Sequence, residues 1–354
     1  MIPESAVATW LSTPGHDPRR EMMRSRFFRK IVLLPCLLFL LAMSHAWVHA
    51  QEKLRVAYTV IAPTQATLWT AKELGLFTKQ GLDVELVLLV GAPLAVTALV
   101  SGETPIVHAG ASAVIASNLQ GSGAVLVAGG ANRFRYVLFV TDEIKRVEDL
   151  RGKKFGVSRI GSADNAAAIT VLNRFGIKET EVTYVQAGSI PARLAAMQTN
   201  ALQATLLQAP ETLKAKEIGL RALLDFTKLD VEWQQNGVAT TRDYIKKKPD
   251  TVRRFIRAYV EGSHYNLTNP KGAQKILQKY LAIKDVKSVE ESYNEIVAKL
   301  TLKVPYPTES GIQLYLDQLK IKNAKAAQAK PSDFTDVSFL KELETSGFID
   351  KLYR

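Results

Sequence analysis

The chain has 354 residues, of which 47% are apolar and 23% are charged, as in an ordinary globular protein long enough for two domains. It holds 46 lysines and arginines against 34 acidic residues, and residues 51–354 keep 40 and 31 of these, a net charge of +9. Basic runs such as residues 246–248 are not interleaved with aromatic residues, which argues against nucleic-acid binding and leaves anionic ligands, a membrane surface or a solvated basic surface.

The N-terminal part of the chain predicts export. A basic stretch over residues 24–30 precedes an apolar run over residues 31–43, and the segment ends in Val48-His49-Ala50. This pattern predicts a Sec-type signal peptide that is cleaved after Ala50, and therefore a periplasmic protein. The run is short for a membrane span, and a retained N-terminal anchor is the alternative. Because residues 1–21 precede the signal, we expect translation to begin at Met22 or Met23.

Few residues are available to hold a metal or to act as a thiol nucleophile. The single cysteine, Cys36, follows Pro35 inside the apolar run, which does not suit a lipoprotein signal. After Ala50 the sequence has no cysteine and only two histidines, His108 and His264. We therefore expect no disulfide, no metal site and no cofactor.

From Leu54 onward, a short apolar strand, a turn of small residues and an amphipathic helix follow one another repeatedly. Three such units are RVAYTVIAPTQATLWTAKELGLF, DVELVLLVGAPLAVTALVSGE and PIVHAGASAVIASNLQG. A strand-rich stretch, AVLVAGGANRFRYVLFV, comes next, and the pattern resumes in KKFGVSRIGSADNAAAITVLNRFG and VTYVQAGSIPARLAAMQTNALQA. Strands that alternate with helices predict an α/β fold with mainly parallel sheets flanked by helices.

After about Gly237 the chain is predicted to be mostly helical. Apolar residues at helical spacing predict helices over residues 250–263, 271–281, 288–300 and 337–345. No strand of comparable strength follows residues 238–240. We expect these helices to pack around the first part of the chain rather than to form a third domain.

The turns between strands and helices are the candidate ligand-binding residues. In open parallel sheets, ligands bind beyond the carboxyl ends of the strands, where the first turn of each following helix offers unpaired N–H groups. Five turns qualify, and the same residues also suit ordinary short turns. They are Pro63, Thr64 and Gln65; Gly91 and Ala92; Gly110, Ala111 and Ser112; Ser162, Ala163 and Asp164; and Gly188 and Ser189.

One of these turns nearly matches a phosphate-binding loop. Gly156 and Gly161 stand at the G-x-x-x-x-G spacing, but Ser162 and Ala163 follow where that loop needs Lys and then Ser or Thr. NTP hydrolysis is therefore not expected, and no other nucleophile, zinc-protease or dinucleotide motif occurs in the sequence. This turn is predicted to be a cradle that offers backbone donors and the Ser162 hydroxyl, with Arg159 adding charge.

Two further residues have both a functional and a structural interpretation. His108, at the end of a predicted strand, is either a ligand contact or general base, or a histidine satisfied within the core; the lack of a nearby partner favours the core. Trp233 either lines a cleft or belongs to the core, which is the commoner place for an aromatic residue.

The chain resembles the substrate-binding proteins of nitrate/sulfonate/taurine/bicarbonate-type ABC importers, which share their fold with the thiamine-pyrimidine-synthase-like group. The matching stretches are ATLWTAKELGLFTKQGLDVELVLL, GAPLAVTALVSGETPIVHAGASA and VEDLRGKKFGVSRIGSADNAAAITVL, and the resemblance extends over about residues 54–319. It implies a two-lobed type II periplasmic binding protein fold, with a ligand cleft between the lobes. Lobe 1 would comprise residues 53–132 and 240–354, and lobe 2 residues 133–239, with hinge strands near residues 132–137 and 236–240.

The resemblance also implies where the ligand binds. The ligand loops of the family fall on residues 62–65, 91–92, 110–112, 162–164 and 188–189, which are the turns already selected, and a further turn at residues 207–210 adds Gln208. The family often has a glycine and an acidic residue where this chain has residues 200–204, so no contact is assigned there.

The expected function is that of a solute-binding protein rather than an enzyme. Such a protein captures a small molecule, an organic or inorganic anion or a heterocycle, by lobe closure and delivers it as a monomer to the membrane subunits of an ABC permease. The alternative is an exported enzyme that acts on a pyrimidine or an aromatic acid, although the cysteine-rich motif of the related pyrimidine synthases is missing. A sensor that signals through a membrane partner is a third interpretation.

Overall fold

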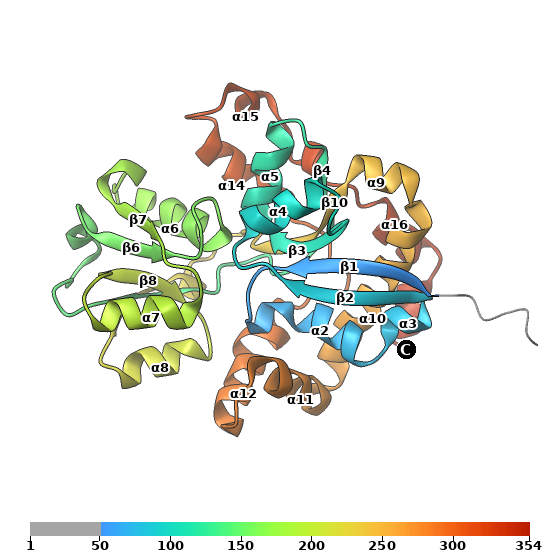
Figure 1. Ribbon diagram of the computed structural model, residues 1–354, viewed down its shortest axis with the longest axis horizontal. Coiled ribbons are helices and arrows are strands. Elements are labelled where there is room, and N and C mark those ends of the chain that lie inside the picture. Colours follow the sequence, from blue (N-terminus) through green and yellow to red (C-terminus); the bar gives the residue numbers. More distant parts are fainter. Residues whose placement is uncertain (1–50) are drawn as a thin grey trace, which may run out of the picture. The chain divides into compact units, whose positions relative to one another are not determined.

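The computed structural model describes residues 51–354, in which two five-stranded sheets are each flanked by helices (Figure 1). The signal peptide and the translation start that the sequence predicts lie outside these residues. The two sheets have the same strand arrangement, in which three parallel strands are followed by one antiparallel strand and a further edge strand.

The first sheet has the strand order β2-β1-β3-β10-β4. Its strands are β1 (Glu52–Tyr58), β2 (Leu82–Leu88), β3 (Ile106–Gly110), β4 (Ala124–Gly129) and β10 (Asn236–Thr241). The helices between them are η1 (Pro63–Gln65), α2 (Ala66–Glu73), α3 (Leu76–Lys79), α4 (Ala92–Val100) and α5 (Ala111–Leu119). Strands β3 and β4 are buried along their whole length, as their unbroken apolar runs require of strands covered on both faces.

The second sheet has the order β7-β6-β8-β5-β9. Its strands are β5 (Val137–Val140), β6 (Lys154–Val157), β7 (Thr183–Gln186), β8 (Ala204–Leu207) and β9 (Arg221–Asp225). Its helices are η2 (Val147–Leu150), α6 (Ala163–Arg174), η3 (Glu179–Glu181), α7 (Ile190–Gln198), α8 (Glu211–Glu217) and η4 (Phe226–Lys228). The expected mainly parallel α/β fold is confirmed, with β5 and β10 as the antiparallel members.

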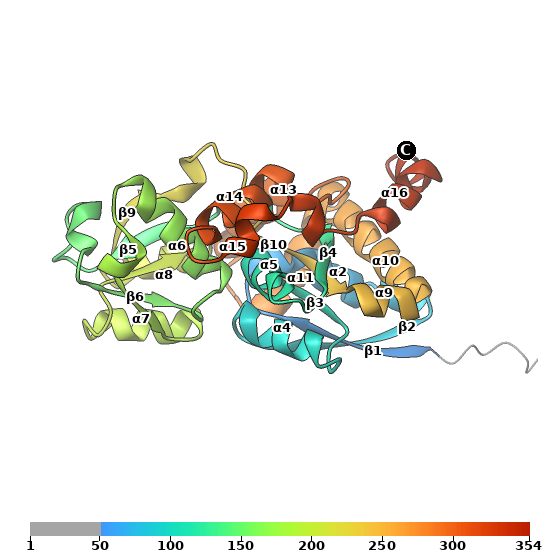
Figure 2. The ribbon, with the colours of Figure 1, turned by 90° about the horizontal axis from the view of Figure 1, so that it is seen from above.

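The chain after β10 is helical, as the sequence predicts, and Figure 2 shows α9, α10 and α16 gathered beside the first sheet. The elements are α9 (Arg242–Lys247), α10 (Pro249–Thr268), α11 (Pro270–Leu281), α12 (Val286–Ser292), η5 (Tyr293–Val297), α13 (Ala298–Leu300), α14 (Glu309–Leu319), α15 (Ala324–Gln328), η6 (Pro331–Phe334), α16 (Ser338–Thr345) and α17 (Phe348–Leu352). Within residues 51–354, no helix combines the length and the apolar content that crossing a bilayer requires.

Two segments cross between the sheets, residues 130–136 and 226–235. They pair at Arg133 and Glu232 in an antiparallel bridge. Trp233 is fully buried, stacks on Phe134 with ring centroids 4.7 Å apart, and lies 4.1 Å from the ring of Tyr315 in α14. Trp233 therefore belongs to the packing under the crossing segments and does not line the cleft described below.

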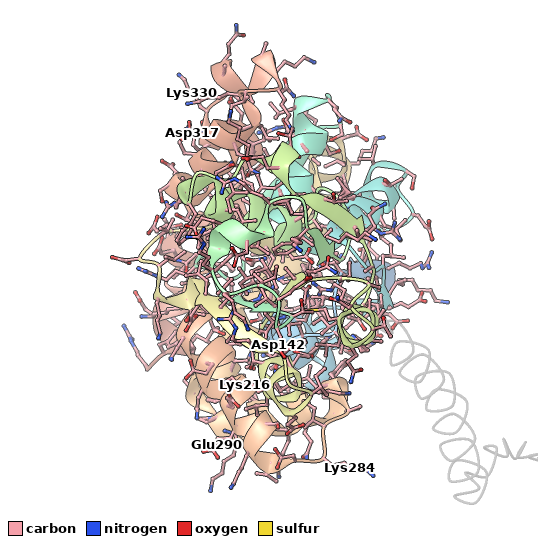
Figure 3. The ribbon with its side chains drawn as sticks, turned by 90° about the vertical axis from the view of Figure 1, so that its left-hand side faces the viewer. Asp142, Lys216, Lys284, Glu290, Asp317 and Lys330 are labelled. Atoms are coloured by element: carbon pink, nitrogen blue, oxygen red, sulfur yellow. The ribbon has the colours of Figure 1, made fainter. Side chains whose placement is uncertain are left out.

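Helix α14 joins this packing to the second sheet, because Thr170 of α6 donates a hydrogen bond to Gln318 of α14 over 3.1 Å. Seen from the side of the second sheet, the outer surface carries charges of both signs (Figure 3). Lys284 and Glu290 lie near one end, and Asp317 and Lys330 near the other. On this face, acidic and basic side chains are thus interspersed.

Candidate functional site

A cleft lies where the carboxyl ends of strands from both sheets face one another. It encloses about 620 Å³ that atoms do not fill, part of it open to solvent. The first sheet contributes the turns after β1, β2 and β3, and the second sheet those after β6, β7 and β8. The crossing segments supply Arg135, Tyr136 and Gln235, and the start of β10 supplies Asn236. Each turn reaches the cleft because a strand ends there and a helix follows.

Ten of the fourteen residues selected from the sequence lie in the lining of this cleft. They are Gln65, Gly91, Ala92, Gly110, Ser162, Ala163, Asp164, Gly188, Ser189 and Gln208. The other four lie elsewhere. Pro63 and Thr64 border a smaller pocket beside Tyr259 of α10, and Ala111 is fully buried. Ser112 is not part of the cleft lining and donates a hydrogen bond to the carbonyl oxygen of Gly161 over 3.0 Å.

The turn that resembles a phosphate-binding loop is already filled by the chain itself. The carboxylate of Asp164, in the first turn of α6, accepts hydrogen bonds from the backbone N–H of Ser158 (2.8 Å) and from its hydroxyl (2.7 Å). The Ser162 hydroxyl lies 2.6 Å from the carbonyl oxygen of Arg159 and also contacts Asp164, so its single hydrogen is donated within the turn. A carboxylate at this helix N-terminus takes the place of a phosphate, in agreement with the missing lysine.

Arg193 of α7 neutralises Asp164. Its Nη1 lies 3.1 Å from Asp164 Oδ2, and both side chains are more than nine-tenths buried. The same nitrogen is within hydrogen-bond distance of the Thr205 hydroxyl (3.0 Å) and of the carbonyl oxygen of Leu206 (3.2 Å). This pair ties the start of α6 to α7 and β8, and it fixes one wall of the cleft.

Arg135 is the buried cation of the cleft that has no acidic partner. It comes from a crossing segment, is 4% exposed, and donates through Nε to Gln208. Its guanidinium lies 5.0 Å from the ring centre of Tyr136, and Nη1 has no hydrogen-bond partner among residues 51–354. Burial lowers the pKa of Arg135 below its ordinary value, yet a guanidinium stays charged. The cleft therefore carries a buried positive charge that has no direct ion-pair partner, although the charge of Asp164 acts on it from a distance.

His108 lies outside the cleft lining, in the core beside α10. Its Nε2 is 3.1 Å from the hydroxyl of Tyr259. Burial, helped by the charge of Arg135, lowers the pKa of His108 to about 3, so the ring is neutral at physiological pH. His108 thus lies in the core, as the structural interpretation predicts, but it is only half satisfied there, because its Nδ1 has no hydrogen-bond partner among residues 51–354.

The loops of the two sheets touch directly across one end of the cleft. Arg159 of the β6–α6 turn donates from Nε to the carbonyl oxygen of Val90 over 2.8 Å, so its charge is directed at the first-sheet loop. The Arg159 stem lies over Gly91, where a Cβ would stand 2.6 Å from its Cγ and Cδ. Beside it, a Cβ on Gly110 would stand 2.9 Å from the Cβ of Ala163. Glycine at both positions allows this close approach.

A second, wider hollow of about 1750 Å³ lies between β9 and the α12–α13 segment. Arg135 also borders this hollow, whereas its other charged residues are at least partly exposed, and Lys299 and Glu295 pair with each other at 2.6 Å. Arg135 and Thr212 are its buried polar residues, whereas many more buried polar side chains line the cleft, so the cleft is the candidate binding site. Among residues 51–354, no group of three or more metal-ligating side chains comes together.

Comparison with known proteins gives the family. The sequence profile of the family described as NMT1/THI5 like matches residues 62–273. A protein of Brucella abortus named as a binding protein is 26% identical over 230 residues, 63% of this chain and 70% of its own.

Solved structures show the same fold at low sequence identity. A protein of Bordetella bronchiseptica superposes with a TM-score of 0.74 at 17% identity, covering 84% of this chain and 98% of its own. The alkanesulfonate-binding protein SsuA of Xanthomonas axonopodis pv. citri, solved with MOPS, superposes with a TM-score of 0.65 at 17% identity. The match covers 79% of this chain and 95% of that protein. The fold is therefore that of the periplasmic binding proteins, and the chain belongs to the NMT1/THI5-like family.

Proposed function

We propose that this chain is the solute-binding component of an ABC importer, which closes around a small anion and delivers it to the permease. Family membership, the fold and the cleft between the two sheets support a binding role. The relatives agree, since one is named as a binding protein and another as an alkanesulfonate-binding protein.

The buried charge of Arg135 is the observation that favours an anionic ligand. The charged side chains of the cleft lining are Arg135, Arg193 and Asp164, a formal charge of +1. Because Arg193 and Asp164 neutralise each other, the excess charge resides at Arg135. A buried charge without a counterion costs several kcal/mol. A ligand that brings one negative charge to Arg135 offsets this cost, and a neutral heterocycle does not.

Closure is proposed to bring together two lobes built on the two sheets. The sequence prediction divides the chain into residues 53–132 and 240–354 against residues 133–239, but residues 236–239 belong to β10 of the first sheet. Residues 53–132 and 236–354 would therefore form one lobe and residues 133–235 the other, with the crossing segments as the hinge. The contacts of Arg159 with Val90 and of Ser112 with Gly161 join the two sides, as expected of a closed arrangement. Export to the periplasm, docking to a permease as a monomer, and the absence of catalysis belong to the same proposal.

The test begins with native mass spectrometry of the protein purified from a periplasmic fraction. A small anion that is retained and released unchanged supports the proposal, and a chemically altered one indicates an enzyme. Thermal-shift and calorimetric titrations with sulfonates, carboxylates and nitrate follow, because a ligand that binds the folded state raises its melting temperature.

Arg135→Met is the variant that tests the anion. We expect it to weaken anion binding by about 10- to 150-fold, which corresponds to a lost charged hydrogen bond of about 1.5–3 kcal/mol. It should also raise the melting temperature of the unliganded protein, since an unpaired buried charge is removed. Arg135→Lys, which keeps the charge, is the control and should retain part of the affinity. Undiminished anion binding in Arg135→Met would remove the basis for an anionic ligand.

A further inference from the structure

Gln65 presents an unusual amide to the cleft. It ends η1, where its backbone N–H donates to the carbonyl oxygen of Ala62 over 3.0 Å. Its side chain is 1% exposed and lines the cleft. Neither Oε1 nor Nε2 has a hydrogen-bond partner among residues 51–354. Because both atoms are unpaired, exchanging the amide oxygen and nitrogen leaves this observation unchanged.

Gln235 adds a second unpaired amide atom to the same cleft. It is fully buried in a crossing segment, and its Nε2 lies 2.8 Å from the hydroxyl of Tyr136. The other end of the amide, Oε1, has no partner in the described part of the chain. The cleft thus offers three distinct things: the cation of Arg135, both ends of one amide at Gln65, and one end of another.

We infer that the ligand is an organic anion that also bears an amide-type group, such as a carboxamide, lactam or ureido group, and that Gln65 binds this group. The inference rests on the proposed solute-binding function and specifies its ligand. An amide edge carries a donor beside an acceptor, so it pairs with both ends of the Gln65 side chain at once. Arg135 then binds the anionic end, and Gln65 determines which anions are accepted.

Anions without hydrogen-bond donors do not fit this arrangement. Nitrate and simple alkanesulfonates carry only acceptor oxygens at neutral pH, so they can satisfy Arg135 and Gln65 Nε2 but not Gln65 Oε1. A buried acceptor left unpaired destabilises the complex, and sites built for a hydrogen bond discriminate strongly against analogues that lack it. Gln65 is therefore a specificity-determining residue, which selects against donor-free anions by leaving its own oxygen unsatisfied.

Matched pairs of probes test this inference by calorimetric titration of the purified protein. Succinamate is compared with 4-oxopentanoate, in which a methyl ketone replaces the carboxamide, and 3-amino-3-oxopropane-1-sulfonate with 3-oxobutane-1-sulfonate. Nitrate and butane-1-sulfonate are the donor-free anions. We expect the amide member of at least one pair to bind about 10-fold more tightly than its ketone, or better. Gln65→Met should reduce this ratio toward one, whereas Gln313→Met, on the exposed face of α14, should leave it unchanged.

Each outcome decides the matter. Equal affinity for amide and ketone, or a preference that survives in Gln65→Met, overturns the inference. Binding of nitrate or butane-1-sulfonate without binding of either amide also overturns it and leaves the proposed function standing. If none of the probes binds at millimolar concentration, both the inference and the anion-binding function fail. The comparison of probes on the unaltered protein requires no variant, so it holds even if Gln65→Met does not fold.

Discussion

The buried pair of Arg193 and Asp164 gives a prediction about stability that does not depend on the identity of the ligand. Replacing Arg193 by Met leaves the Asp164 carboxylate buried without its cation, 3.1 Å from where the guanidinium was. Breaking a buried pair in this way costs about 3–5 kcal/mol. Asp164 keeps its hydrogen bonds from Ser158, so we expect the lower end, about 3 kcal/mol.

The reverse change, Asp164→Asn, leaves the buried guanidinium of Arg193 without its ion-pair partner and with only neutral acceptors, such as the Thr205 hydroxyl and the Leu206 carbonyl, and we expect a similar loss of stability. The double variant removes both charges, so its loss should be smaller than the sum of the single losses by about 2 kcal/mol. Urea unfolding followed by circular dichroism measures all three free energies. In thermal unfolding, each single substitution should lower the melting temperature by about 6–12 °C in a chain of this size.

The exposed pair of Lys299 and Glu295, 2.6 Å apart, is the control. Lys299→Met should cost less than about 1 kcal/mol, because exposed pairs contribute little. The claim that this buried pair fixes the cleft wall would be refuted in two ways. The single variants at Arg193 and Asp164 could lose as little free energy of unfolding as Lys299→Met, or their losses could simply add in the double variant.

Two further predictions concern closure and pH. Gly110→Ala places a methyl group 2.9 Å from the Cβ of Ala163 on the facing loop, so ligand affinity should fall by about 5- to 150-fold. Adding Ala163→Gly to the same chain should restore the affinity, and ligand titration of the single and double variants checks both expectations. A normal affinity in Gly110→Ala would count against contact of these loops in the bound state. Burial raises the pKa of Glu211 to about 7, so the folded state holds the proton more tightly than the unfolded state and stability falls as pH rises from about 4.5 through 7. Glu211→Gln should therefore melt at the wild-type temperature near pH 4.5 and above it at pH 8, and parallel melting curves across this range would contradict the shift.

The fold could be predicted from the sequence because its signals are local. Apolar runs that end in small residues marked the strands and turns, and apolar spacing marked α10, α11 and α16. Helix α14 was missed, although Ile312, Tyr315 and Leu316 have the spacing of a buried helical face. Its role in packing against a crossing segment depends on contacts between distant parts of the chain.

The site was only partly predictable for the same reason. Turn residues could be selected one at a time, but Arg135 and Gln235 come from crossing segments whose meeting point no local pattern indicates. Arg193 could have been predicted, because it shares the buried face of α7 with Ile190, Leu194 and Met197. A charged side chain on a buried helical face indicates that an acidic partner lies nearby. Ser112 and Ser162 show the opposite case, in which a suitable residue type is used inside the protein.

Trp233, which contacts the rings of Phe134 and Tyr315, allows the crossing segments to be followed by intrinsic tryptophan fluorescence. Residues 51–354 contain two indoles, and the other, Trp69, stacks on Tyr280 in a different part of the protein. Replacing Trp69 by Phe would leave the tryptophan fluorescence of residues 51–354 to Trp233, which lies in one of the segments proposed as the hinge. Any bending of the crossing segments changes the surroundings of that indole. The protein thus carries an internal probe with which opening and closing can be followed in real time without an attached dye.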